Sequence, residues 1–197
     1  SLMQVQLDLY NSTRHPDQDA DTLQTIKMVT EQNDRLSKMV KTLLDMSELQ
    51  TVGRDEKIIV DALIDEVLED LEPLAQEKNI KLIGKCKDIT MVGSDILIYR
   101  LVYNLVENAI KYNHLGGQVT VTAYQKEKHI YLSVEDTGSG IPEDLRERVF
   151  EPFFRVDKSR SRELGGVGLG LALVREIVRV HDGSITVRAN PSGGTSF

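Results

Sequence analysis

The sequence predicts an α+β protein in which a helical hairpin precedes a mixed sheet covered on one face by helices. Three observations lead to this prediction: a seven-residue apolar repeat near the start, its break around Gly53, and alternating short strand and helix patterns after the break. A length of 197 residues suits one full domain with an additional segment. We therefore expect the hairpin within residues 1–52 and a second domain over residues 55–197.

The repeat occupies residues 20–50. Its positions are spaced as in a coiled-coil seam, and they are Ile26, Asn33, Val40 and Ser47 in one set and Val29, Leu36, Leu43 and Gln50 in the other. Such a seam requires a partner helix, for which residues 3–10 are too short, while the polar residues 11–21 are typical of a connecting loop. The polar members of the seam fit a bundle that uses them to set register, or equally a hairpin that tolerates solvent.

After the break, strand and helix patterns alternate. Strands are expected at residues 57–60, 80–83 and 89–92, in a hairpin of residues 119–124 and 129–134, near residues 185–187 and from Thr195 onward. Helices are expected from Asp61, as the N-cap, to about Lys78, and over residues 95–112 and 169–181.

Composition excludes several classes of function. The chain has 24 Lys and Arg against 31 Asp and Glu, a formal charge of -7, which argues against broad contact with nucleic-acid backbones. The single Cys86 excludes an intrachain disulfide and a multi-cysteine zinc site, and suits a cytoplasmic protein. Because no apolar run approaches about 20 residues, we expect no membrane contact from this segment. An anchor upstream in the intact protein is compatible with this expectation.

The helix expected at residues 95–112 has a polar face that could hold a ligand. At about 100° per residue, Asn104, Asn108 and Lys111 share a narrow arc flanked by Arg100 and Glu107. Two amides can present oxygens to a hard cation, and the lysine can reach the phosphates that accompany it. A solvated helix face is the alternative. The separate apolar arc contains Ile98, Leu101, Val102, Leu105 and Ala109, and Leu97 falls outside it on the polar side.

Glycines are concentrated in two segments, residues 136–142 and 165–171, which hold six of the 14 in the chain. The second segment runs into an expected helix start, where free N–H groups favour phosphate. In the first segment, Asp136 ends an apolar strand and can accept a hydrogen bond from a ligand's exocyclic amine; a simple strand-end turn is the alternative. Neither segment has the spacing of a P-loop or of a dinucleotide-binding fold.

Five motifs together identify a family. Residues 104–112 (Asn-Leu-Val-Glu-Asn-Ala-Ile-Lys-Tyr), 136–142 (Asp-Thr-Gly-Ser-Gly-Ile-Pro), 150–155 (Phe-Glu-Pro-Phe-Phe-Arg), 166–171 (Gly-Val-Gly-Leu-Gly-Leu) and 193–195 (Gly-Gly-Thr) occur in this order. They closely resemble the N, G1, F, G2 and G3 boxes of the sensor histidine kinase ATP-binding domain. The resemblance covers about residues 55–197 and implies the Bergerat-type α/β sandwich shared with Hsp90, gyrase B and MutL.

The resemblance implies a role for each matching position. Asn108 would coordinate Mg²⁺ on the ATP phosphates, with Asn104 beside it and Lys111 on the phosphates. Asp136 would bind the adenine amino group, and residues 150–168 would form a mobile lid, although a disordered surface loop is an equal interpretation of that segment. The other implied nucleotide contacts are Tyr112, Gly138, Gly140, Ile141, Phe153 with Phe154 at the base of the lid, Arg155, Gly166, Gly168, Leu169, Gly170, Leu171 and Thr195.

The front of the chain departs from the family. A preceding hairpin would be the dimerisation and histidine phosphotransfer domain, but a His-acid-basic-Thr-Pro acceptor motif is absent, and His15 lies in the expected loop without that context. We expect a truncation just after the motif, Ser1 and Leu2 being compatible with a vector remnant, and a final strand that is also cut short. The chain should therefore bind ATP without phosphorylating itself.

The resemblance implies the ATP-binding catalytic part of a two-component sensor kinase. The enzyme would pass a phosphoryl group to histidine and then to an aspartate of a response-regulator receiver domain, as a homodimer joined through the hairpin. Glu107 is a weak catalytic candidate, because a solvated glutamate explains it as well. One alternative is a nucleotide-sensing dimer without kinase output. Asn104 disfavours an Hsp90-like ATPase, which has a glutamate base there, and the seven-residue seam disfavours a serine-directed kinase of the anti-sigma type.

Overall fold

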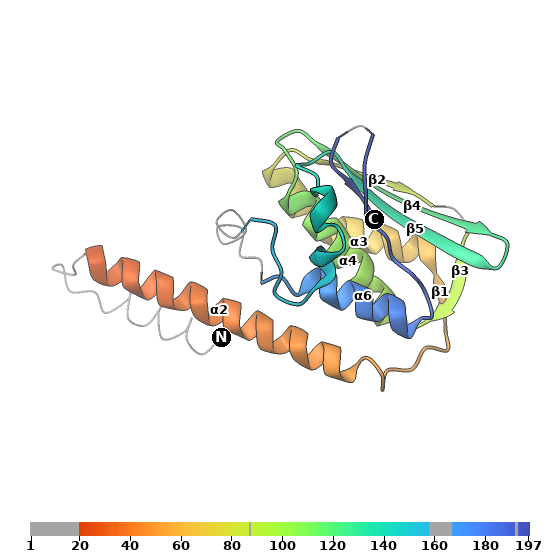
Figure 1. The fold of residues 1–197 in the computed structure, drawn as a ribbon, viewed down its shortest axis with the longest axis horizontal. Helices are drawn as coiled ribbons and strands as arrows, with labels where there is room; N and C mark the ends of the chain where they lie inside the picture. Colours follow the sequence, from red (N-terminus) through yellow and green to blue (C-terminus); the bar gives the residue numbers. More distant parts are fainter. Residues whose placement is uncertain (1–19, 87, 158–166, 192) are drawn as a thin grey trace. The chain divides into compact units, whose positions relative to one another are not determined.

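The computed structural model describes residues 20–86, 88–157, 167–191 and 193–197, and its fold is drawn in Figure 1. The chain divides into two compact units, Ser1–Lys41 and Thr42–Phe197. The expected first arm of the hairpin, residues 3–10, and His15 lie outside the described residues. The predicted domain boundary near Gly53 is a different division of the chain, and it stays a prediction.

Helix α2 (Ala20–Glu48) carries the seven-residue repeat. It starts before the predicted loop ends, because Ala20 is a strong helix former and Asp21 suits a first helical turn. Apart from the half-buried Ile26, the apolar side chains of the repeat are exposed on α2, with exposed fractions of 49% for Val29, 59% for Leu36 and 56% for Val40. The helix thus presents an apolar stripe of the kind that a second helix covers.

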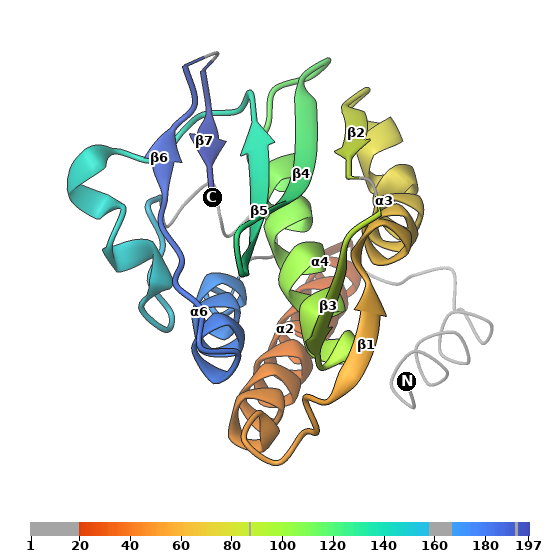
Figure 2. The same ribbon diagram turned by 90° about the vertical axis from the view of Figure 1, so that its right-hand side faces the viewer.

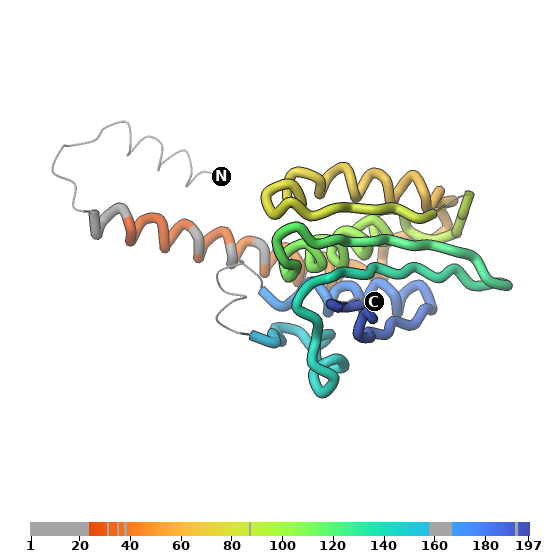
Figure 3. Tube along the Cα trace, turned by 90° about the horizontal axis from the view of Figure 1, so that it is seen from above, coloured from red at the N-terminus to blue at the C-terminus, as the bar shows by residue number. Residues whose placement is uncertain are grey.

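The second unit contains a five-stranded sheet in the described part of the chain, in the order β2-β4-β5-β7-β6. Its strands are β2 (Lys81–Lys85), β4 (Gln118–Lys126), β5 (His129–Asp136), β6 (Arg188–Ala189) and β7 (Thr195–Ser196). Strand β2 pairs parallel with β4 and the other pairs are antiparallel, so the sheet is mixed, as predicted. Figure 3 shows the long β4 and β5 running side by side.

A separate antiparallel pair joins β1 (Glu56–Ile59) to β3 (Thr90–Gly93). Between them the chain forms helix α3 (Val60–Glu77), and after them come α4 (Asp95–Lys111), two short 3-10 turns, η1 (Glu143–Leu145) and η2 (Arg148–Phe150), and α6 (Gly170–Val180). Helices α3, α4 and α6 lie on one face of the sheet (Figure 1). The predicted fold class is confirmed.

The core of this unit is aliphatic and lies between the sheet and the three helices. Inward residues of the central hairpin, such as Val119, Val121 and Val134, are almost completely buried there. Helix α4 packs between α3 and α6 (Figure 2), so both of its flanks are covered. The prediction that Leu97 lies on a polar side is therefore wrong: Leu97 is 2% exposed, because a helix covered on two flanks needs more than one apolar arc.

Three local predictions are also corrected. Asp61 does not cap α3, because the helix begins one residue earlier and the first N–H, of Val60, donates to the Ile89 carbonyl at 2.9 Å. The strand expected at residues 185–187 forms instead at Arg188–Ala189, where pairing with β7 is available. The loop of the central hairpin is shorter than predicted, because the pairing extends to Lys126 and His129 and leaves Glu127 with a φ of 57°.

Candidate functional site

The polar face of α4 meets the first residue of α6. Asn104 and Asn108 are both half-buried, and the Asn104 amide donates to the Arg100 carbonyl at 2.7 Å. A Cβ placed on Gly170 would lie 2.9 Å from the Asn104 Oδ1 and 3.8 Å from the Asn108 Nδ2. The two predicted amides therefore face the start of α6, and this approach is open because residue 170 has no side chain.

The start of α6 has the features of an anion site. Its N-cap residue, Leu169, is buried and makes no side-chain cap, so the first N–H groups of the helix are not satisfied by a capping side chain. Gly168, with a φ of 79°, turns the chain into the helix, and Leu171 is half-buried in the first turn. Free N–H groups and the helix dipole favour phosphate here. Gly166, also predicted for this segment, lies outside the described residues.

The segment that was predicted as the base of the lid is attached to this turn through its backbone. The Phe153 N–H donates to the Gly168 carbonyl at 2.7 Å, and a Cβ on Gly168 would overlap the backbone of Phe153 and Phe154. The Phe153 ring is 54% exposed, whereas Phe150 is buried and packs edge-to-face on Phe197. The Phe153 backbone thus joins this segment to the turn before α6, and the Phe150 ring, which was not predicted to take part, packs the segment against Phe197. The anchoring of a lid by Phe153 and Phe154 stays a prediction.

The remainder of the predicted lid is only partly described. Arg148 lies over the Phe154 ring, with its guanidinium carbon 4.4 Å from the ring centre. Arg155, the predicted γ-phosphate contact, is half-buried just after that ring. Residues 158–166 lie outside the described residues, so the contacts of the lid stay a prediction.

Asp136 stands at the centre of a corner built from backbone. Its Oδ1 accepts hydrogen bonds from the Gly138 N–H at 2.7 Å and from the Thr195 N–H at 3.2 Å, and the side chain is almost fully buried. A Cβ on Gly194 would overlap the Asp136 carbonyl, and one on Gly140 would lie 3.3 Å from the Gly194 carbonyl. Residues 136–142 and the Gly-Gly-Thr motif of residues 193–195 thus contact each other around one carboxylate, although almost 60 residues separate Asp136 from Gly194.

Burial sets the electrostatics of this corner. Loss of water raises the pKa of the Asp136 carboxyl above its ordinary value, and the hydrogen bonds from Gly138 and Thr195 oppose the shift only in part. A ligand that donates a hydrogen bond would compensate the buried charge. Ile141, which directly follows Gly140, is half-buried and is the apolar residue of this glycine segment.

The end of α4 is fixed to the same corner. The Tyr112 carbonyl accepts the Ser139 N–H at 3.1 Å, so the predicted ligand contact Tyr112 is held against the G1 segment. Tyr112 lies eight residues, or roughly 12 Å of helix, beyond Asn104. Helix α4 therefore connects the carboxylate corner at its end to the amide pair facing α6, over a length comparable with a nucleoside triphosphate.

Two residues of this corner were missed in the sequence. The Asn113 Oδ1 accepts the His114 N–H at 2.9 Å and the Thr137 hydroxyl at 3.2 Å, and its Nδ2 donates to the Gln118 carbonyl at 3.1 Å. Asn113 is 4% exposed. Thr137 in turn accepts the Gln118 N–H at 2.9 Å. The signal that could have found Asn113 is its position directly after a helix end, where asparagine commonly satisfies loop backbone.

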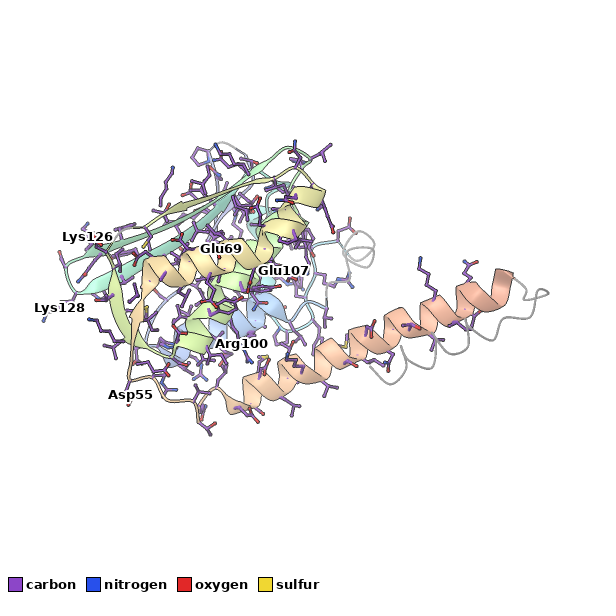
Figure 4. The ribbon with its side chains drawn as sticks, turned by 180° about the vertical axis from the view of Figure 1, so that it is seen from behind. Asp55, Glu69, Arg100, Glu107, Lys126 and Lys128 are labelled. Carbon is purple, nitrogen blue, oxygen red and sulfur yellow. The ribbon has the colours of Figure 1, made fainter. Side chains whose placement is uncertain are left out.

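Lys111 is paired within α4. Its Nζ lies 2.7 Å from the Glu107 Oε1, one helical turn back, and both side chains are about one-quarter exposed. Figure 4 labels Glu107 and Arg100 on α4 and Glu69 on the neighbouring α3. A phosphate that binds Lys111 must compete with Glu107, which gives the glutamate a role other than the catalytic one considered from the sequence.

The described residues place two limits on the chemistry. Among them, no three His, Cys, Asp or Glu side chains cluster as metal ligands do, so any metal here depends on amide oxygens and on the ligand. No helix within the described ranges is both long and apolar enough to span a membrane.

The mixed sheet, its one-sided helical layer and the glycine-bounded corner define an ATP-binding α/β sandwich. Residues 93–197 match the family model described as histidine kinase-, DNA gyrase B-, and HSP90-like ATPase. This match covers more than half of the chain, and the chain belongs to that family.

Known proteins resemble more than this segment. The sensor-like histidine kinase SenX3 of Mycolicibacterium smegmatis is 36% identical over 185 residues, which are 91% of this chain and 48% of SenX3. The solved mycobacterial sensor histidine kinase MprB aligns with a TM-score of 0.63 at 32% identity, over 72% of this chain and 93% of that one. Full-length ShkA in complex with AMPPNP aligns with a TM-score of 0.71 at 26% identity, over 91% of this chain and 38% of ShkA.

The chain spans about half the length of the curated relative SenX3. The recognition of the histidine kinase family from the five motifs is confirmed, since the relatives are named histidine kinases.

Proposed function

We propose that this chain is the ATP-binding catalytic part of a two-component sensor histidine kinase. It would bind Mg-ATP, transfer the terminal phosphoryl group to a histidine, and so supply an aspartate on a receiver domain. The observation that carries the proposal is the span of α4: Asn104 and Asn108 face the Gly170 end of α6, and Tyr112 closes on the Asp136 corner. The ATP analogue in the ShkA structure supports the same ligand class.

Adenine is assigned to the corner. The Asp136 carboxylate would accept the exocyclic amine, which compensates the cost of burying its charge. Gly138, Gly140 and Gly194 would let the chain segments around the base approach closely, because a side chain at any of them would meet neighbouring backbone. The remaining neighbours of the base would be Tyr112, Ile141 and Thr195.

The triphosphate is assigned to the gap between α4 and α6. The backbone N–H groups at the head of α6, those of Gly168, Leu169 and Gly170, and the Lys111 ammonium would neutralise its charge. Such positioning and neutralisation are most of what a protein contributes to phosphoryl transfer. Glu107 would hold Lys111 until the phosphate arrives.

The donor set fits Mg²⁺. Asn108, with Asn104 beside it, offers amide oxygens next to an anion site, and hard oxygen donors are the ligands that Mg²⁺ takes together with phosphate. When bound, the ion would offset charge on the phosphate oxygens.

The intact protein would act as a homodimer through its helical segment. The exposed Val29, Leu36 and Val40 form an apolar stripe on α2, and a second copy of the same helix is the simplest partner with a matching repeat. Light scattering of the chain and of Leu36→Glu tests this. We expect the molar mass of a dimer for the chain and that of a monomer for the variant, and the same molar mass for both proteins would contradict the proposal.

Transfer of label tests the kinase function. The chain would be incubated with γ-labelled ATP and Mg²⁺, alone and with a separate polypeptide that carries an acceptor histidine from a similar kinase. We expect no label on the chain itself, because it has no acceptor motif, and acid-labile label on the added polypeptide. Label on His15 would overturn the first expectation. ATP binding without transfer to any acceptor histidine would instead favour a nucleotide-sensing dimer.

A further inference from the structure

His181 is bound on both sides of its ring by backbone groups of different elements. It is the C-cap residue of α6, and its Nδ1 lies 2.8 Å from the Ile177 carbonyl one turn back in that helix. Its Nε2 accepts the N–H of Ser94, at the start of α4, at 3.1 Å. The ring therefore joins the end of one helix to the beginning of another.

These two contacts define the protonation state of the ring. A carbonyl can only accept, so Nδ1 carries the proton, and a backbone N–H can only donate, so Nε2 is bare. His181 is thus the neutral Nδ1–H tautomer in this geometry. A protonated imidazole has donors at both nitrogens and would face the Ser94 N–H with another N–H.

The start of α4 depends on such external acceptors. The Ser94 hydroxyl makes no cap and, among the described residues, is buried without a hydrogen-bond partner. Two other side chains take the hydrogen bonds of the first N–H groups. The Ser94 N–H donates to His181, and the Asp95 N–H donates to the Glu56 carboxylate at 2.9 Å. Gly93 admits the ring, because a Cβ there would lie 3.1 Å from two of its atoms.

The same two helices also form the proposed phosphate site. Helices α4 and α6 pack against each other: the last turn of α6 places His181 beside Ser94 at the start of α4, and the first residue of α6, Gly170, lies beside Asn104 near the middle of α4. A change in the attachment at Ser94 alters the separation at Asn104, since both helices are rigid elements.

We propose that neutral His181 is a positioning residue for nucleotide binding, and that its protonation breaks the hydrogen bond between the start of α4 and the end of α6 and so weakens the binding of Mg-ATP. This inference rests on the proposed function. It adds a pH-dependent element that lies outside the five motifs and contacts no assigned ligand group.

Charged residues of three elements adjoin this attachment. Glu56 of β1 accepts the N–H of Asp95 in the first turn of α4, and Arg179 and Asp182 are within two residues of His181 at the end of α6, where Arg179 pairs with Glu176 at 2.8 Å.

A measurement on the unmodified chain tests the tautomer. Long-range ¹⁵N–¹H spectra of the imidazole distinguish Nδ1–H from Nε2–H, and amide exchange reports the protection of the Ser94 N–H. We expect Nδ1–H and a protected Ser94 amide at pH 7.5, with the protection lost on acidification. An Nε2–H tautomer, or an unprotected Ser94 amide at pH 7.5, would overturn the inference whether or not ATP binds.

Two variants test the link to nucleotide. His181→Gln keeps an acceptor for Ser94 that does not titrate, and His181→Phe keeps a ring but has no acceptor. Affinity for Mg-ATP is measured by calorimetry between pH 5.5 and 7.5. The phosphate itself titrates near pH 6, so each affinity is expressed relative to that of His181→Gln.

We expect the relative affinity of the unmodified chain to fall roughly three- to tenfold on acidification, and that of His181→Phe to be low by the same factor at every pH. A relative affinity independent of pH would overturn the inference. Absence of ATP binding in all three proteins would overturn the proposed function, and the positioning role with it, while the tautomer would still be read from the spectra.

Discussion

The two ends of the proposed site are constructed differently. At the Asp136 corner, the contacts are made by backbone N–H groups of Gly138 and Thr195, and glycines keep the chains within contact distance. The other part, here called the α4–α6 end, consists of the polar face of α4 from Asn104 to Lys111 and the start of α6. Its groups are side chains that pair with their neighbours: Lys111 with Glu107, and Asn104 with the Arg100 carbonyl.

This difference separates a preformed end from an adjustable one. Backbone groups held by the sheet have no alternative positions, so the corner is ready for its ligand before the ligand arrives. Side chains that pair with each other must exchange those partners for phosphate, which costs part of the affinity. Substitutions should therefore have large effects at the corner and graded effects at the α4–α6 end.

Gly194→Ala should have the largest effect. Gly194 has a φ of 84°, and its Cβ would overlap the Asp136 carbonyl and the Gly138 N–H, neither of which can move without displacing the sheet. Strain and overpacking together should cost about 2–5 kcal/mol of the free energy of unfolding. Urea denaturation measures the loss, and ATP binding should become undetectable by calorimetry.

Gly193→Ala is the matched control. Gly193 also has a positive φ, 90°, but a Cβ there meets nothing within 4 Å. Its cost should be limited to the backbone strain of about 1–2 kcal/mol. Equal losses in both variants would show that the close packing around Asp136 is not what makes this end rigid.

Asp136→Asn should lower the affinity for ATP about a hundredfold. The amide oxygen can still accept from Gly138 and Thr195, but the charge that strengthens the bond to the adenine amine is gone, and the amide NH₂ opposes it. Calorimetry at saturating Mg²⁺ measures the change. Asp144→Asn, at an exposed acid of η1, is the control, and an effect of similar size there would contradict the assignment.

The same variant should change the dependence of stability on pH. Because burial raises the Asp136 pKa in the folded chain, ionisation favours the unfolded state, in which the pKa is near 3.9. The stability that the protonated form contributes is complete below that value and is lost as pH rises through the raised folded pKa. Denaturation of the ligand-free chain should show this fall, and Asp136→Asn should lack it. If the stability of the unmodified chain and that of Asp136→Asn changed with pH in the same way, burial of the Asp136 charge would not be the cause.

Sequence reasoning was most successful where a pattern is local. The polar face of α4 and the glycines before α6 follow from helical spacing and from turn chemistry, and the structure places Asn104 beside Gly170. Asn113 and Thr137 were missed because their hydrogen bond joins residues 24 apart, and the position of Asn113 after the end of α4 does not reveal a partner so distant in sequence. Leu97 was misassigned because a second flank of α4 is covered, which a single apolar arc does not predict. Asp61 was misassigned because the first N–H of α3 finds its acceptor in the Ile89 carbonyl and not in a capping side chain.

Asn108→Ala should weaken Mg-ATP binding at least tenfold. The substitution removes the amide oxygen assigned to the ion while leaving the helix intact, since alanine is the best helix former. Calorimetry at fixed Mg²⁺ and again in excess chelator separates the two contributions, and the loss should nearly vanish without the metal. Gln125→Ala, an exposed amide on β4, is the control. An unchanged affinity in Asn108→Ala would contradict the metal role.

Glu107→Gln should have the smallest effect, and in the opposite direction. It removes the carboxylate 2.7 Å from the Lys111 ammonium, so the lysine no longer has to leave a charged partner for phosphate. Because the pair is partly exposed and worth little in solvent, ATP affinity should rise only about two- to threefold, and less at high salt. Glu69→Gln on α3 controls for net charge (Figure 4). A loss of affinity in Glu107→Gln, not seen in Glu69→Gln, would instead give Glu107 a direct part in binding and make the α4–α6 end as fixed as the corner.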